Sequence, residues 1–177
     1  MELRAAWQRQ SLPSPDRAWY FITGCTLDRA RFFKKMEAMK AWLDTYQELL
    51  DELHFISGAW VMLDNHYHIL IQPKNATDIG RFVGRLHGKT ARELNEKEEQ
   101  PNRKIWYRFW NVRLQSEKQF WMRMNAIHYN PVKHGYVTKP QEWFFSSYRP
   151  YFESDDKDWL KSLWKEYPVA RIEVDIF

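Results

Sequence analysis

The chain has 177 residues, of which 44% are hydrophobic, and this suits one ordinary domain with a sizeable core. Lys and Arg outnumber Asp and Glu by 27 to 23, so an anionic partner is allowed but not required. The single cysteine, Cys25, excludes an internal disulfide and a zinc site of several thiolates. No apolar run reaches the ~20 residues of a membrane span, so we expect a soluble cytoplasmic protein without a signal peptide.

Seven segments carry the periodicity or composition of strands and helices. In chain order they are a strand at 18–26, a helix at 35–53, a hairpin of strands at 55–63 and 67–72, a helix that begins near 77 or 78 and ends near 95, a strand at 105–114, and a helix capped by Ser116 and closed by Pro131. The order β, α, β, β, α, β, α contains the split βαβ arrangement. We therefore predict an α+β fold with a ferredoxin-like antiparallel sheet and packed helices.

The chain divides into three parts. We expect a flexible basic arm at residues 1–17, the folded domain at residues 18–152 and a C-terminal extension at residues 153–177. Within the extension, DWLKSLWKEY predicts a short helix and VARIEVDIF predicts a strand, but neither segment indicates a role.

The stretch DNHYHILIQPKN places two histidines one residue apart at the start of a strand. Because side chains alternate between the two faces of a strand, His66 and His68 share one face and Tyr67 points to the other. Two neutral imidazoles on one face can share a metal ion, although half-buried, hydrogen-bonded histidines would give the same pattern. A metal site would need a further ligand from a neighbouring element.

The helix after Ser116 offers candidates for that ligand in the segment MRMNAIHYNPVKHG. At about 100° per residue, Arg123, Ala126 and Asn130 lie on one flank of its core face, from which they can reach toward the histidines. The carbonyl oxygen of Asn130 suits Mg²⁺ or Mn²⁺, whereas its alternative role is to end the helix before proline. Tyr129 falls opposite the core face.

The helix that follows the hairpin carries a row of cations beside its buried stripe. Arg81, Arg85, Lys89 and Arg92 follow one another at steps of four, four and three residues. Such a row suits DNA phosphates, and it is also what an ordinary solvated helix face contains.

The strand at 105–114 is rich in aromatic residues. Trp106, Tyr107, Phe109 and Trp110 fall on both of its faces. One face can stack on unpaired bases while the other packs into the core, and core packing is the more common destination for such side chains.

Four segments together resemble a known family. VMLDNHYHILI, IWYRFWN, AIHYNPVKHGYV and EWFFSSY resemble, in their order and spacing, the REP-associated tyrosine transposases of the single-tyrosine HUH superfamily. The resemblance runs from about residue 19 to residue 151 and identifies residues 18–152 as an HUH transposase domain. The combination is specific, although each motif alone is not.

The resemblance implies the parts of a DNA-cleaving site. The HUH motif falls on His66, Tyr67 and His68, and Asn130 takes the place of the third metal ligand, so the implied cofactor is Mg²⁺ or Mn²⁺. The family's nucleophilic tyrosine corresponds to Ala126, one helical turn before Asn130. A methyl group cannot attack phosphorus. Tyr129 is the alternative nucleophile, but its place about 100° around the helix from Asn130 argues against it.

The implied reaction is metal-dependent cleavage and rejoining of single-stranded DNA beside hairpins of repetitive extragenic palindromes, through a 5′-phosphotyrosine. With Ala126 the chain is expected to be inactive, and one Tyr-to-Ala difference among family-like residues favours an engineered substitution over a natural loss. Two alternatives stay open. One is a non-catalytic hairpin DNA-binding protein on a transposase scaffold, and the other is an RNA-binding module whose sheet stacks bases.

The expected partner is a DNA hairpin with a single-stranded flank. The residues expected to contact it are the helix row Arg81, Arg85, Lys89 and Arg92, then Lys133 and His134 near the end of the active helix, and Arg4, Arg9 and Arg17 in the arm. The resemblance also implies a bacterial, nucleoid-associated protein that is a monomer or a homodimer and does not contact a membrane.

Overall fold

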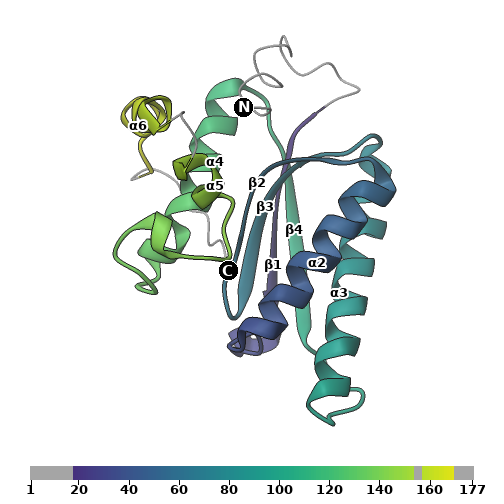
Figure 1. Cartoon of the computed structure of the whole chain (residues 1–177). Helices are drawn as coiled ribbons and strands as arrows, with labels where there is room; N and C mark the ends of the chain where they lie inside the picture. The colour runs from purple at the N-terminus through teal and green to yellow at the C-terminus, as the bar shows by residue number, and fades with distance from the viewer. Residues whose placement is uncertain (1–17, 154–156, 170–177) are drawn as a thin grey trace.

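The computed structural model of the chain describes residues 18–153 and 157–169 (Figure 1). Four strands form one sheet, and they are β1 (Tyr20–Thr26), β2 (Ile56–Met62), β3 (His66–Gln72) and β4 (Trp106–Arg113). Their order in the sheet is β2-β3-β1-β4, and every neighbouring pair is antiparallel. The predicted ferredoxin-like α+β fold is confirmed, because this order is that of a split βαβ sheet.

In the described part of the chain, α-helices lie on both sides of the sheet. They are α2 (Met36–Leu53), α3 (Ile79–Lys97), α4 (Glu117–Lys133), α5 (Tyr148–Glu153) and α6 (Lys157–Glu166). Figure 1 shows α2 and α3 along one face of the sheet and α4 and α5 on the other. None of the helices in the described part of the chain is long and apolar enough to cross a membrane.

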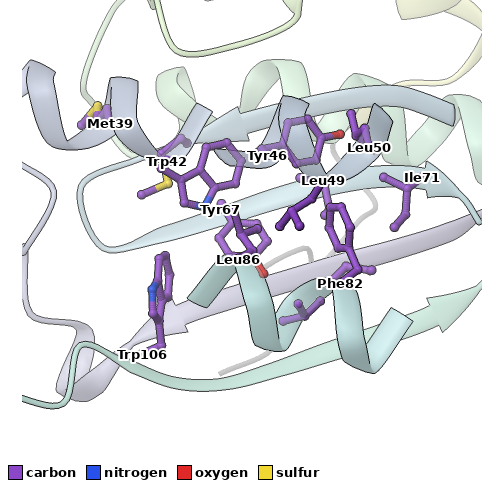
Figure 2. Close-up of a cluster of buried hydrophobic side chains, with 14 of the residues drawn as sticks. Met39, Trp42, Tyr46, Leu49, Leu50, Tyr67, Ile71, Phe82, Leu86 and Trp106 are labelled. Atoms are coloured by element: carbon purple, nitrogen blue, oxygen red, sulfur yellow. The ribbon is translucent and has the colours of Figure 1, made fainter. Parts of the chain in front are cut away.

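The α2–α3 face is closed by a large aromatic core. Apolar residues that recur every three or four positions along α2 and α3 meet alternate residues of β3, as Figure 2 shows for Trp42, Phe82 and Tyr67. Trp42 is fully buried, with its ring centroid 5.3 Å from that of Tyr46 and 5.0 Å from that of Tyr67. The stripe predicted for α3 from its periodicity is buried as expected.

The other face carries a second core under α4. The core face of this helix, Phe120, Met124 and Ile127, packs against strand residues that include Phe21 and Leu70. The α6 side chains of Leu160 and Leu163 belong to the same cluster, so the helix predicted for DWLKSLWKEY is confirmed and packs on the domain. The strand predicted for VARIEVDIF and the arm at 1–17 lie almost entirely outside the described residues.

Two details of the helix ends differ from prediction. Asp78 makes no side-chain cap hydrogen bond, because a 3-10 turn (Ala76–Asp78) runs directly into α3; its carboxylate instead pairs with Arg81 at 3.3 Å. Pro131 lies inside α4 rather than closing it. Proline removes one backbone donor, but the helix continues through Lys133, and the backbone N–H of His134 donates to the carbonyl of Asn130 at 3.0 Å. Ser116 caps α4 as predicted, accepting from the backbone of Gln119.

A register shift in β4 separates its aromatic residues. Cys25 pairs with Arg108 and Thr26 pairs with Trp106, so Tyr107 is the extra residue of a bulge. Trp106 and Phe109 consequently pack into the α2–α3 core, whereas Tyr107 and Trp110 stay exposed. Half of the predicted aromatic set is thus core, and half lies on the surface.

Candidate functional site

The two histidines of the HYH stretch stand on the α4 face of the sheet, as strand alternation predicts. Their ring centroids are 5.1 Å apart. Tyr67 points to the opposite face and crosses β1 at Gly24, where a Cβ atom would overlap its ring. Its hydroxyl lies 3.0 Å from Nε2 of His87 on α3. The middle residue of the motif therefore belongs to the core, and the outer two form the site.

Asn130 reaches the histidines from α4. Its Oδ1 atom lies 3.2 Å from Nε2 of His66, and the side chain is fully buried. The Nδ1 atom of His66 lies 2.6 Å from the amide oxygen of Asn65. In the neutral tautomer that donates from Nδ1 to Asn65, Nε2 turns a lone pair toward the oxygen of Asn130. A cation between Nε2 and Oδ1 would stabilise that tautomer.

Thr23 of β1 fixes the second histidine. Its hydroxyl lies 2.7 Å from Nδ1 of His68, which is fully buried. Each histidine is therefore held through Nδ1, and Nε2 is the nitrogen suited to a metal ion. The pairing of β1 with β3 sets this contact, because Thr23 lies directly opposite His68 in the sheet.

The spacing of these side chains can accommodate a divalent cation. In an octahedral Mg²⁺ site each ligand atom is about 2.1 Å from the metal, so two ligand atoms at right angles lie about 3 Å apart. The distance from Nε2 of His66 to Oδ1 of Asn130, 3.2 Å, is close to this value. Among residues 18–153 and 157–169, no three His, Cys, Asp or Glu side chains form a cluster that could hold a metal. Two imidazoles and an amide oxygen are thus the available set. The three predicted ligands come together, although their role as ligands stays a prediction.

Ala126 lies one turn before Asn130 on α4. It is 2% exposed and packs in the second core. Tyr129 points elsewhere, as its helix position predicts. It is half-buried, and its ring centroid lies 5.8 Å from that of Trp164 on α6. Its ring therefore packs on the α6 side of α4.

A cavity of about 160 Å³ opens beside His66. Its lining residues are Cys25, Arg29, Arg31, Asn65, His66, His134 and Tyr136. The ring of His134 lies 4.9 Å from that of His66, so the predicted residue at the end of α4 does approach the site. Lys133 ends the same helix and is exposed. The cavity brings the cationic side chains of Arg29 and Arg31 close to His66, which suits an anion.

Three polar residues at the cavity wall are hydrogen-bonded to one another. Tyr136 donates to the carboxylate of Asp64 at 2.5 Å and accepts from the guanidinium of Arg31 at 3.2 Å. Arg31 also pairs with Asp64 at 3.1 Å. Burial and the hydrogen bond to Asp64 raise the pKa of Tyr136 to about 12, and Arg31 opposes this shift. The phenol is therefore protonated at neutral pH.

The predicted row of cations on α3 lies across the sheet from the histidines. Arg85 makes two hydrogen bonds with Glu52 of α2, and Lys89 pairs with Glu48 of α2 at 2.7 Å. Arg92 is exposed. The arm residues Arg4, Arg9 and Arg17 lie outside the described residues. Contact of this row with DNA stays a prediction, and the structure does not bring the row to the metal ligands.

Sequence reasoning missed the residues that hold the site together. Thr23, Asp64, Arg31 and Tyr136 depend on strand register and on loop packing, which no short spacing in the chain reveals. A partial signal was present, because Asp64 and Asn65 directly precede the first histidine, and polar residues before a ligand often orient it.

Comparisons with known proteins agree with this architecture. A sequence model of IS200-like transposases matches residues 16–118, which include both histidines and end at the start of α4, before Ala126 and Asn130. A Haemophilus influenzae protein assigned as a REP-associated tyrosine transposase is 28% identical over 139 residues, covering 73% of this chain and 78% of that protein. A REP-associated tyrosine transposase of Escherichia coli is 29% identical over 96 residues, covering 53% of this chain and 54% of that protein.

The fold is also that of a solved relative. The structure of a REP-associated tyrosine transposase bound to a REP hairpin superposes on this chain with a TM-score of 0.61 at 22% identity. The superposition covers 93% of this chain and 90% of the other. At this identity the likeness concerns the fold.

Proposed function

Because this chain belongs to the IS200-like transposase family, we propose that it binds hairpins of repetitive extragenic palindromes through a divalent-metal site and lacks the nucleophile that would cleave them. The observation that carries the proposal is the meeting of His66, His68 and Asn130 from β3 and α4. Two of its relatives are REP-associated tyrosine transposases, and a solved one of this kind is bound to a REP hairpin.

The metal site of the proposal is Mg²⁺ or Mn²⁺ held by His66, His68 and Asn130. The bound ion would stabilise negative charge on a DNA phosphate. Asn65 and Thr23 hold the two imidazoles with Nδ1 engaged, so both rings are oriented before any ligand arrives. The cations that line the neighbouring cavity attract the DNA backbone to the same place.

The proposal that the chain lacks a nucleophile is based on Ala126. In the family reaction a tyrosine oxygen forms a bond to phosphorus while the bond from phosphorus to the 3′ oxygen breaks. Ala126 has no oxygen, and Tyr129 packs toward Trp164 instead. The hydroxyl of Tyr136 is held by Asp64 and Arg31, and its raised pKa keeps the phenol protonated. Binding is thus retained without cleavage.

Calorimetric titration with Mn²⁺ tests the metal half of the proposal. The chain should bind one ion, and the double variant His66→Ala, His68→Ala should lower the affinity at least 10-fold, because two of three protein ligands are lost. His54→Asn is the matched control, since His54 is an exposed histidine at the end of α2. Equal affinities in the double variant and the control would refute the site.

Incubation with hairpin DNA tests the catalytic half. The unmodified chain should bind a palindromic hairpin and give neither cleavage nor a covalent adduct with Mg²⁺ or Mn²⁺. Ala126→Tyr should give a denaturant-resistant protein–DNA adduct, and adding His66→Ala should abolish it. Thermal melting checks that the buried position accepts the larger ring. An adduct of the unmodified chain that Tyr129→Phe or Tyr136→Phe removes would refute the claim of a missing nucleophile. A folded but inert revertant would favour a scaffold used for binding alone.

A further inference from the structure

A buried hydrogen bond joins α4 to the segment that follows it. Nε2 of His128 lies 2.9 Å from the hydroxyl oxygen of Ser147. His128 is fully buried, and the ring centroids of Tyr148 and Tyr151 lie 5.3 Å and 5.7 Å from that of its imidazole. The bond is therefore enclosed by aromatic side chains, where a hydrogen bond is electrostatically stronger than in water.

Ser147 is held in turn by β2, the strand at the edge of the sheet. Its backbone N–H donates to the carbonyl of Trp60 at 2.9 Å, and its hydroxyl accepts from the backbone N–H of Trp60 at 2.9 Å. The next residue of β2, Val61, lies directly opposite His68 of β3. A hydrogen-bonded path thus runs from α4 through Ser147 to the pair of strands that carries the two histidines.

His128 and Asn130 lie on opposite flanks of the core face of α4. At about 100° per residue, and with the buried Ile127 at the centre of that face, His128 lies about 100° to one side and Asn130 about 60° to the other. Apolar packing holds α4 on the sheet but has no direction. A hydrogen bond has a direction, so the bond to Ser147 sets the rotation of α4 about its own axis and thereby the direction of the Asn130 amide.

Stability alone does not favour a histidine at this position. Among residues 18–153 and 157–169, Nδ1 of His128 is a buried atom that has no hydrogen-bond partner. An unpaired buried nitrogen lowers the free energy of unfolding, so an apolar side chain of similar size would pack at least as well. A directional contact on this flank of α4 is what the histidine adds.

We propose that His128, through Ser147, holds α4 in the rotation that brings Asn130 to His66. The distance that this link maintains is the 3.2 Å between Oδ1 of Asn130 and Nε2 of His66. His128 is a positioning residue, because it acts through Asn130 and is not itself a ligand. The inference rests on the proposed function, since the metal site that Asn130 completes is part of it.

A double-mutant cycle of Mn²⁺ affinity, measured by calorimetry, tests the inference. His128→Leu should lower the affinity about 10-fold, the lower end of the range for loss of a residue that orients a metal ligand. In an Asn130→Ala background the same substitution should change the affinity less than about 2-fold, because the ligand that it positions is gone. His128→Gln should retain most of the affinity, since its amide can still donate to Ser147.

Asn125→Leu is the matched control on the same helix. Asn125 is fully buried, and its amide donates to the carbonyls of Leu163 and Tyr167 at 3.0 Å and 2.9 Å, at the end of α6. The substitution removes polar contacts of α4 that do not involve the sheet. It should lower the melting temperature and leave the Mn²⁺ affinity within about 2-fold of that of the unmodified chain.

Thermal melting shows whether each variant is folded at the temperature of the titration. If His128→Leu is not, Ser147→Ala breaks the same link from the other side and takes its place in the cycle. An affinity that His128→Leu lowers no more than Asn125→Leu does, or lowers equally with and without Asn130, would overturn the inference while the proposed function stands. If the unmodified chain binds no Mn²⁺, the proposed function fails and the inference fails with it.

Discussion

The two faces of the sheet use the same residue types for opposite purposes. On the α2–α3 face, tryptophans and tyrosines pack against one another in the buried core (Figure 2). Outside this core, cations of α3 pair with glutamates of α2. On the α4 face, Nε2 of His66 lies 3.2 Å from Oδ1 of Asn130 and the rings of His66 and His68 lie 5.1 Å apart. Trp110, on the outer strand β4 of the same face, is exposed. The role of a histidine, an arginine or a tryptophan in this sequence thus depends on the face of the sheet on which its side chain lies.

The largest expected difference between the faces concerns tryptophan. Trp42→Ala should lower the free energy of unfolding by about 3–5 kcal/mol, because the ring is fully buried between Tyr46 and Tyr67 and its removal leaves a cavity. Trp110→Ala should cost less than about 1 kcal/mol, since much of its ring already contacts solvent. Urea unfolding of both variants measures the contrast. Similar losses for the two would mean that Trp110 supports the fold as much as the buried Trp42 does.

Periodicity predicted the fold well because it reports burial directly. The stripe of α3 and the core face of α4 are buried as their three-to-four spacing requires, and the alternation of β3 sends His66 and His68 to one face. These features depend only on neighbours within one element. The sheet order also followed from the order of elements, because few topologies connect them with short loops.

Contacts between distant segments could not be predicted in the same way. Thr23 meets His68 because of strand register, and Arg85 meets Glu52 because two helices pack side by side. A helical row of cations has the same spacing whether it faces a partner helix, water or DNA. The meeting of Asn130 with the histidines was foreseen from a helix position and a family resemblance, whereas spacing alone left its helix-ending role open.

Acid should destabilise both faces through one buried histidine on each. Burial lowers the pKa of His87 and of His128 to about 3, against about 6.5 in an unfolded chain. Below pH 6.5 these histidines therefore bind protons in the unfolded chain but not in the folded chain, so the free energy of unfolding decreases as the pH falls. Above about pH 7 the two histidines have no effect on it. Between pH 7 and pH 5 each histidine should remove about 2 kcal/mol from the free energy of unfolding.

Urea unfolding at several pH values measures these contributions. His87→Gln and His128→Gln should each reduce the pH dependence by about the same amount, whatever their effect at pH 7. Glutamine at position 128 can keep the hydrogen bond that joins α4 to Ser147, now 2.9 Å long. A pH dependence that neither substitution alters would show that the acid sensitivity arises from carboxylates instead.

The smallest expected effect concerns the cations of α3. Arg85→Ala with Lys89→Ala should change hairpin affinity less than about threefold and leave its salt dependence intact, because Glu52 and Glu48 already neutralise these side chains and the row faces away from the histidines. A hairpin stem that does cross α3 would instead make affinity fall and flatten the salt dependence by about two phosphate contacts.

The reciprocal variant, Glu48→Gln with Glu52→Gln, separates the two cases further. It releases both cations, so it should strengthen binding only if DNA reaches this face. If hairpin affinity is unchanged in both double variants, the hairpin is recognised on the α4 side of the sheet. If the alanine variant weakens binding and the glutamine variant strengthens it, the hairpin stem contacts the row of cations on α3.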